Sequence, residues 1–351
     1  MRFKKAGLIS QHFMKKTLLV LFTLTSTICG AQAGESVYAF LNLPTSPRQI
    51  GLGGAPLTLK SDVNQPLWNP ASIGSEMQEK VAVNFTNYLA GINLGSLTFT
   101  TSLHEKLGLF HAGIQYLDYG ELTRADEMGN VLGNFKSYDL ALSMGYAHAL
   151  KSLNLQMGVN AKLINSRIDT YSSFGLAFDL AFLYEDAKSP LKISMVLRNI
   201  GTQITTFNGA KEALPFRWLL GASSRLKHVP IQWFVTIDNL QQWDISDPNP
   251  SQIVVEIDSN TTKEEEISFA NNAFRHAVFG FEFFPENKLT LRLGYSYKKA
   301  RELEILDQRA FNGLSYGFGL KMKNFEFNYA LSKFHPSANS NTFGLVLNLD
   351  K

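Results

Sequence analysis

The sequence predicts an all-β protein, a transmembrane β-barrel of about 14 antiparallel strands with an N-terminal segment folded into its lumen. Three observations predict this fold. Apolar and polar residues alternate along many stretches, which is the pattern of a strand with two unlike faces. These stretches average about ten residues, and a tilted strand needs about 9–11 residues to cross a bilayer. The connections between them are alternately short and long, as in outer-membrane barrels.

Residues 1–33 have the three parts of a secretory signal peptide: a basic start, the apolar stretch 17–28 and a small-x-small site that ends at Ala33. The apolar stretch is too short to span a membrane. We therefore expect cleavage near Ala33, with translation starting at Met1 or Met14. The basic residues of this segment account for the formal charge of +3, because acidic residues outnumber basic ones in the remainder. That remainder offers no basic surface for nucleic acid.

The composition is 45% hydrophobic and 18% charged, which argues against disorder. Cys29 is the one cysteine, so a disulfide scaffold and a multi-cysteine metal site are excluded. It lies within the predicted signal peptide, where the alternative is a lipidated cysteine, although the bulky Ile28 before it is unusual for that modification. The histidines do not form a metal-binding spacing, and we expect neither a metal nor another cofactor.

Residues 34–80 do not alternate, and we expect them to form a plug inside the barrel. Two groups of turn-forming residues mark this segment: Gly51, Gly53 and Gly54, and then Trp68, Asn69 and Pro70. Glycine lets a backbone turn tightly and lie close to a wall. A phosphate-binding loop is the alternative for the glycines, but the third glycine of that motif and a surrounding βαβ unit are missing.

Residues 81–351 supply the barrel strands, and no stretch after Val81 shows a convincing helical period. The predicted spans are 81–88, 92–103, 107–119, 137–149, 153–168, 172–184, 191–199, 217–226, 231–239, 277–284, 289–298, 315–322, 325–332 and 342–349. An even number of strands places both ends of the barrel on the periplasmic, short-turn side. A soluble β-sandwich or propeller is the alternative, since its strands also have one apolar face.

The long connections are expected on the extracellular side, at 240–276, 120–136, 200–216 and 299–314. The longest carries the residues that we select as a candidate docking site for a partner: Trp243, Asp247, Glu264, Glu265 and Glu266. Calcium binding is conceivable for this acidic loop, but the spacing of an EF-hand is absent, and a solvated surface is the default interpretation.

Charged residues recur on the face of the strands that would point inward: Asp139, Lys162, Asp179, Arg198, Glu282, Arg292, Lys321 and Glu326. They predict a polar lumen. Because unpaired buried charges are costly, we expect them to pair with the plug rather than to line an open channel. Residues 313–317 match G-x-S-x-G, the motif of a nucleophilic serine. Alternation continues through this stretch, which favours a lumen-facing Ser315 over a catalytic one.

Residues 34–44 (GESVYAFLNLP), Ser46–Arg48 and the glycine group resemble the start of the PorV/PorQ family of outer-membrane barrels, which belong to the type IX secretion system of Bacteroidetes. Residues 68–71 (WNPA) are similar to an element of the wider FadL-like class. Residues 119–120 and 123–127 also resemble a segment of the family. The chain departs from many outer-membrane proteins in lacking a terminal aromatic residue.

This resemblance implies a non-catalytic barrel, in contact with outer-membrane lipid, that anchors a cell-surface attachment complex through its long loops. The partners that it implies are PorV, PorU and PorZ, and it implies no catalytic residue. The alternative, from the similarity to the FadL-like class, is an outer-membrane transporter of hydrophobic small molecules. A lipase, which would depend on Ser315 alone, is the third hypothesis.

Overall fold

The computed structural model describes residues 36–104, 108–245, 254–256, 261–263, 267–303, 312–335 and 338–349. The chain divides into two units, Met1–Glu35 and Ser36–Lys351, and all the described residues belong to the second. The predicted signal peptide and its cleavage site near Ala33 therefore lie outside the described residues.

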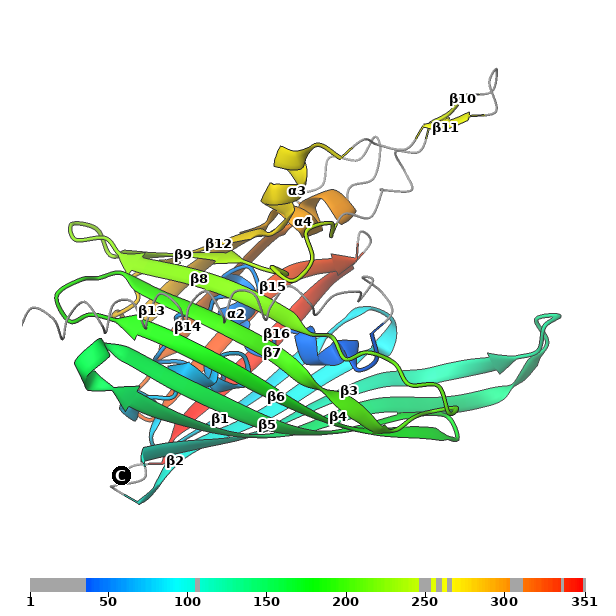
Figure 1. Ribbon diagram of the computed structural model, residues 1–351, viewed down its shortest axis with the longest axis horizontal. Coiled ribbons are helices and arrows are strands. Elements are labelled where there is room, and N and C mark those ends of the chain that lie inside the picture. Colours follow the sequence, from blue (N-terminus) through cyan, green and yellow to red (C-terminus); the bar gives the residue numbers. More distant parts are fainter. Residues whose placement is uncertain are drawn as a thin grey trace, which may run out of the picture. The chain divides into compact units, whose positions relative to one another are not determined.

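Fourteen antiparallel strands form a closed barrel in which each strand pairs with its neighbour along the chain and β1 pairs with β16 (Figure 1). They are β1 (Lys80–Asn87), β2 (Asn93–His104), β3 (Gly108–Ala125), β4 (Val131–Leu150), β5 (Leu155–Ile168), β6 (Tyr171–Glu185), β7 (Lys192–Thr205), β8 (Arg217–Arg225), β9 (Ile231–Ile237), β12 (Ala277–Phe283), β13 (Leu289–Ser296), β14 (Leu314–Lys321), β15 (Phe325–His335) and β16 (Ala338–Asn348). Closure leaves no free sheet edge, which a barrel in lipid requires. The predicted fold class is confirmed, and each predicted span matches one of these strands.

Several predicted strand ends are wrong. Residues 120–136, expected to form a loop, are largely a continuation of β3 and β4, which pair from Glu121↔Lys136 to Ala125↔Val131. Strand β7 continues through residues 200–205, and β15 and β16 continue into the expected loop 333–341. These extensions are mostly polar on both faces, so alternation could not mark them.

Two short helices follow Val81, although no stretch there shows a convincing helical period. Helix α3 (Phe269–Arg275) precedes β12, and helix α4 (Tyr297–Glu302) follows β13 and ends that strand two residues early. Single 3-10 turns also lie at η6 (Leu89–Gly91) and η7 (Lys151–Leu153). Two short strands, β10 (Val254–Glu256) and β11 (Thr261–Lys263), pair within the longest connection. None of the described helices has both the length and the hydropathy to cross a bilayer.

The two faces of each strand differ as the alternation predicts. In β3, Gly113 and Gln115 are buried, whereas Ile114 and Tyr116 between them are about 40% exposed (39% and 41%). Exposed apolar side chains such as Val83, Phe85 and Phe178 continue this pattern around the barrel. A polar inside and an apolar outside are the arrangement of a barrel whose wall faces lipid.

Residues 36–79, which we call the luminal segment, run through the inside of the barrel (blue in Figure 1). The segment has four 3-10 turns and one α-helical turn: η2 (Ala39–Asn42), α2 (Pro47–Gly51), η3 (Gln65–Leu67), η4 (Pro70–Ser72) and η5 (Ser75–Met77). Ser36 bridges to Ala213 in the connection 206–216, at the end of the barrel that carries the long connections. Lys80 begins β1 at the opposite end, which carries the short turns. The segment therefore passes from the long-loop end to the short-turn end.

Candidate functional site

The inner wall of the barrel holds the luminal segment through separate apolar clusters. At the long-loop end, Val37, Phe40 and Leu41 pack on wall residues of β2 to β6. Those wall residues are Leu94, Leu117, Ala141, Ile164 and Ala177. Further along, Leu57, Leu67 and Trp68 pack on β6, β7 and β8, through Ala181, Leu183, Val196 and Leu219. Most inward-facing positions are polar, as the sequence predicts, but these two parts of the inner wall are apolar.

The glycine group lies where the luminal segment turns against the wall. Gly51 ends α2, and Gly53 and Gly54 follow with φ values of +94° and +99°, which only glycine adopts without strain. A Cβ on Gly53 would lie 2.5 Å from Val278 Cγ1. The Gly53 N–H donates to Ser315 Oγ at 3.2 Å. Ser315 is buried on the inner face of β14, where it accepts this backbone hydrogen bond.

Trp68, Asn69 and Pro70 form a buried turn in the middle of the segment. Asn69 caps η4, because its Oδ1 accepts from Ala71 N at 2.9 Å while its Nδ2 donates to Leu57 O and to Ser194 Oγ of β7. Gly158 of β5 makes room for this turn, since a Cβ there would overlap the Pro70–Ala71 peptide. The asparagine thus fixes the turn both to the segment and to the wall.

Two arginines of the wall lie beside Trp68. The guanidinium carbon of Arg198 is 3.9 Å from the Trp68 ring centroid, and that of Arg217 is 5.9 Å away. Arg198 is 1% exposed and donates through Nη2 to Leu41 O at 2.9 Å. Its Nε and Nη1 have no hydrogen-bond partner among the described residues. Arg217 pairs with Asp238. The aromatic face therefore takes the place of a carboxylate for Arg198.

An ion-pair network fixes the other half of the segment. Arg48 of α2 donates to both carboxylate oxygens of Glu282, through Nε at 3.0 Å and Nη2 at 2.8 Å. Arg292 donates to the same carboxylate through Nε at 2.9 Å, and Glu282 itself is fully buried. Burial alone would lower the pKa of Arg48, but the Glu282 carboxylate more than reverses this effect and holds the pKa above its usual value. Arg48 therefore stays charged and ties the segment to β12.

The inward charges of the wall otherwise pair mostly with one another. Lys162 lies 2.7 Å from Asp179 and donates to Asn199 at 2.9 Å. Asp139 accepts from the hydroxyls of Tyr119 and Ser166. Of the inward charges named from the sequence, Glu282 accepts directly from a cation of the segment. Arg48, the residue that makes this link, was not among the residues selected from the sequence.

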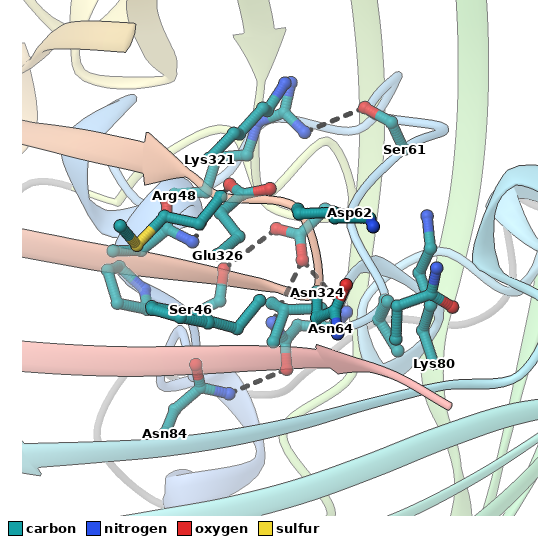
Figure 2. Close-up of a pocket in the computed structure, with 18 residues that line it drawn as sticks. Ser46, Arg48, Ser61, Asp62, Asn64, Lys80, Asn84, Lys321, Asn324 and Glu326 are labelled. Carbon is teal, nitrogen blue, oxygen red and sulfur yellow. Dashed lines mark hydrogen bonds between the residues drawn. The ribbon is translucent and has the colours of Figure 1, made fainter. Parts of the chain in front are cut away.

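A polar cavity of about 180 Å³ lies at the short-turn end, between the luminal segment and the wall formed by β14, β15, β16 and β1. Figure 2 shows Arg48, Asp62 and Asn64 of the segment meeting Lys321 and Glu326 of the wall in this cavity. Asp62 accepts from Ser46 Oγ and from Asn64, and Asn64 accepts from Asn84 of β1 at 2.7 Å.

The residues selected as a docking site lie mostly outside the described part of the chain. Asp247, Glu264, Glu265 and Glu266 fall in gaps of the description. Trp243 is 52% exposed, and its ring stacks on those of Phe269 of α3 (4.7 Å) and His276 (5.5 Å). The structure thus places one selected residue in an aromatic group at the long-loop end. Among the described residues there is no cluster of three or more metal-ligating side chains.

Comparisons with known proteins identify the fold. No protein-family model matches the chain, and no curated protein matches its sequence. The chain is similar in structure to the toluene transporter TbuX of Ralstonia pickettii, with a TM-score of 0.53, 11% identity, and coverage of 88% of this chain and 98% of TbuX. It is also similar to a mutant of the TodX monoaromatic hydrocarbon channel, with a TM-score of 0.52, 13% identity, and coverage of 87% and 98%. The chain therefore has the barrel fold of FadL-like outer-membrane channels.

Proposed function

We propose that this protein is an outer-membrane channel for small hydrophobic molecules, and that the luminal segment closes it. The observation that carries the proposal is the apolar part of the inner wall at the long-loop end. A lumen built only for water and ions would be lined by polar side chains. Here the wall instead offers Leu94, Leu117 and Ile164 to apolar side chains of the luminal segment. A hydrophobic molecule could take over these contacts if that part of the segment moved away.

The similarity to TbuX and TodX supports this proposal, because TbuX is a toluene transporter and TodX is a monoaromatic hydrocarbon channel. Toluene and other monoaromatic compounds are the class of molecule that we propose to test first. An aromatic side chain, Trp68, lies in the second apolar cluster, and the guanidinium groups of Arg198 and Arg217 lie over its ring.

A disulfide lock tests whether passage requires movement of the luminal segment. Ser36, next to the residues that would move, bridges to Ala213 in the connection 206–216. Paired strands lie about 4.7–4.9 Å apart, within the range of about 4.4–6.8 Å between the Cα atoms of a disulfide, so a bond between cysteines is feasible in Ser36→Cys/Ala213→Cys. Cys29 lies in the predicted signal peptide, so after the predicted cleavage no other cysteine competes.

We expect the oxidised double variant to block uptake of a fluorescent naphthyl probe by cells whose outer membrane contains the protein. Reduction with dithiothreitol should restore uptake, and each single cysteine variant should take up the probe under both conditions. Equal uptake with the bond closed and open would contradict a moving segment. No uptake above that of cells without the protein would contradict the channel itself.

A second proposed function is anchoring of a surface complex, of the type IX attachment kind that the N-terminal resemblance implies. Exposed apolar side chains at the long-loop end favour it. Met128 is 88% exposed at the tip of the β3–β4 hairpin, Val131 is 69% exposed beside it, and Phe269 of α3 is 75% exposed. Exposed apolar groups outside the lipid-facing band are typical of surfaces that bind partners.

Loop deletion tests this second proposal. Removal of residues 245–272 should leave the barrel assembled but release partner proteins from native outer membranes, as read by mild-detergent pull-down and mass spectrometry. Retention of the same partners after this deletion and after deletion of the other long loops would contradict loop anchoring.

A further inference from the structure

Three lysines surround the cavity at the short-turn end. Lys80 begins β1, Lys321 ends β14, and Lys323 lies in the turn that follows. Lys80 donates to the backbone oxygen of Glu76, and Lys321 donates to Pro285 O at 3.0 Å. Within the described part of the chain, none of these three ammonium groups lies within 4.0 Å of a carboxylate oxygen. None of the three is therefore held in a close ion pair by a described residue, and the nearest acid along the sheet is Glu326, which lies opposite Lys321 on β15.

The two carboxylates that line the cavity already have hydrogen-bond partners. Both oxygens of Asp62 accept hydrogen bonds at 3.0 Å, one from Ser46 and the other from Asn64. Glu326 accepts from Asn328 at 3.0 Å and lies 3.8 Å from Arg292. Both acids are thus hydrogen-bonded to polar groups of the segment and the wall, and Figure 2 shows them in the same cavity as Lys321.

The Arg48 guanidinium adds a cation to the same lining, but its charge is compensated by Glu282. The lining as a whole therefore has an excess of positive charge supplied by the three lysines. Asparagine side chains, among them Asn324 and Asn348, complete the rim. Ammonium groups and side-chain amides are both donors to oxyanions.

We propose that this cavity binds a small oxyanion, a phosphate or a carboxylate, that enters from the short-turn side of the barrel. A volume of about 180 Å³ exceeds the share of one water, about 30 Å³ in the liquid, so the cavity can hold such an ion with bridging waters. Lysine binds phosphate as a point charge, without the fixed geometry that arginine imposes. The proposal is independent of what passes through the barrel, since the cavity lies beside the segment and not along the apolar wall.

Isothermal titration calorimetry on the complete mature barrel in a non-ionic detergent, in a chloride buffer of low ionic strength, tests the proposal. Inorganic phosphate and succinate are the probes, added singly and in competition. We expect saturable binding of at least one probe at one site per barrel, weakened by added salt. Competition between the two probes would support one shared site, and binding of phosphate alone or succinate alone would identify the chemical source.

The variant Lys80→Gln/Lys321→Gln should weaken binding by about tenfold or more, because each hydrogen bond to a charged group contributes about 1.5–3 kcal/mol. The matched control Lys151→Gln/Lys188→Gln loses the same charge at other short turns and should bind as the unaltered protein does. Glu326→Gln should strengthen binding several-fold, because it removes a negative charge from the cavity lining.

Heat-modifiable migration in electrophoresis shows whether each variant is an assembled barrel. If the double lysine variant does not assemble, two single variants test the proposal instead. Lys323→Gln should weaken binding of the anion, and Glu326→Gln should strengthen it. The proposal is wrong if neither probe binds the unaltered protein, or if the lysine variants bind as tightly as the control. It is also wrong if assembled Glu326→Gln binds more weakly than the unaltered protein.

Discussion

Replacement of Glu282 by glutamine should loosen the luminal segment while leaving the barrel closed. Glu282 is 0% exposed and accepts from Arg48 at 3.0 and 2.8 Å and from Arg292 at 2.9 Å. Glutamine has nearly the same shape, but its amide nitrogen cannot accept from a guanidinium. Two buried cations would then compete for one neutral oxygen, at the point where α2 is tied to β12.

The expected cost can be worked from this geometry. Removing one partner of a buried ion pair costs about 3–5 kcal/mol, because the remaining charge stays buried without compensation. In Glu282→Gln both Arg48 and Arg292 lose that compensation. In Arg48→Met the pair between Glu282 and Arg292 survives, so the segment loses one contact and no charge is stranded. We therefore expect Glu282→Gln to release the segment more easily than Arg48→Met.

Hydrogen exchange of the amides at Ile50 and Gly54 measures this release. Both are bonded within the turn of α2, to Ser46 O at 3.0 Å and to Gln49 O at 2.8 Å. A loss of about 3 kcal/mol corresponds to exchange faster by about a hundredfold. Lys192→Gln is the control, since its pair with Glu185 is partly exposed and such pairs contribute less than about 1 kcal/mol. A loss of protection in Glu282→Gln that is no greater than in Arg48→Met would contradict a stranded charge on Arg48 and Arg292.

Three further predictions follow from the contacts of the segment. Gly158→Ala should displace the buried turn and shift tryptophan emission to the red, whereas Gly95→Ala, whose nearest atom would be 4.0 Å away, should not. Burial lowers the pKa of Lys299 in α4 to about 8, whereas a lysine in the unfolded chain has a pKa of about 10.4. Between these two pH values the unfolded chain binds more protons than the folded one. The packing of α4 should therefore become more stable as the pH rises from about 8 to 10.4. Amine-labelling of Lys299 should be half-maximal near pH 8, and a midpoint near 10.4 would contradict its burial. Ser315→Ala should cost no more than about 1 kcal/mol, because the Gly53 N–H loses one acceptor but still donates to Ile50 O at 3.1 Å, and should leave uptake unchanged; abolished uptake in an assembled barrel would contradict this.

The strands could be predicted because a barrel wall in lipid imposes a period of two on nearly every residue that it contains. The stretch 289–298 shows both the success and its limit. Its alternation predicts β13, but Tyr297 and Lys298 begin α4 instead of ending the strand. A helix of six or seven residues is too short to show a helical period, so α3 could not be predicted from the sequence either.

The sequence predicts which charged wall residues face the lumen, but not which residues of the luminal segment they contact. The alternation places Glu282 and Arg292 inward, and cross-strand neighbours of opposite charge already indicate a pair. Nothing local connects them to Arg48, which lies 234 positions before Glu282 in the sequence. Gly51, Gly53 and Gly54 could be selected because closely spaced glycines indicate a tight turn. The wall glycines that make room for the segment, such as Gly158, cannot be distinguished by sequence from other glycines in strands.

The two kinds of contact along the luminal segment have different consequences for its movement. Apolar contacts such as those of Phe40 and Leu41 are non-directional, and a hydrophobic molecule can replace them at little cost. The bidentate contact between Arg48 and Glu282 has a fixed geometry, and no uncharged molecule can replace it. Under the proposed channel function, a molecule that arrives from the long-loop end therefore displaces residues 37–41 first and meets the ion-pair network last. Movement that stops before Arg48 would leave the segment attached and able to return, because its register on the wall is kept by the charged contacts rather than by the apolar ones.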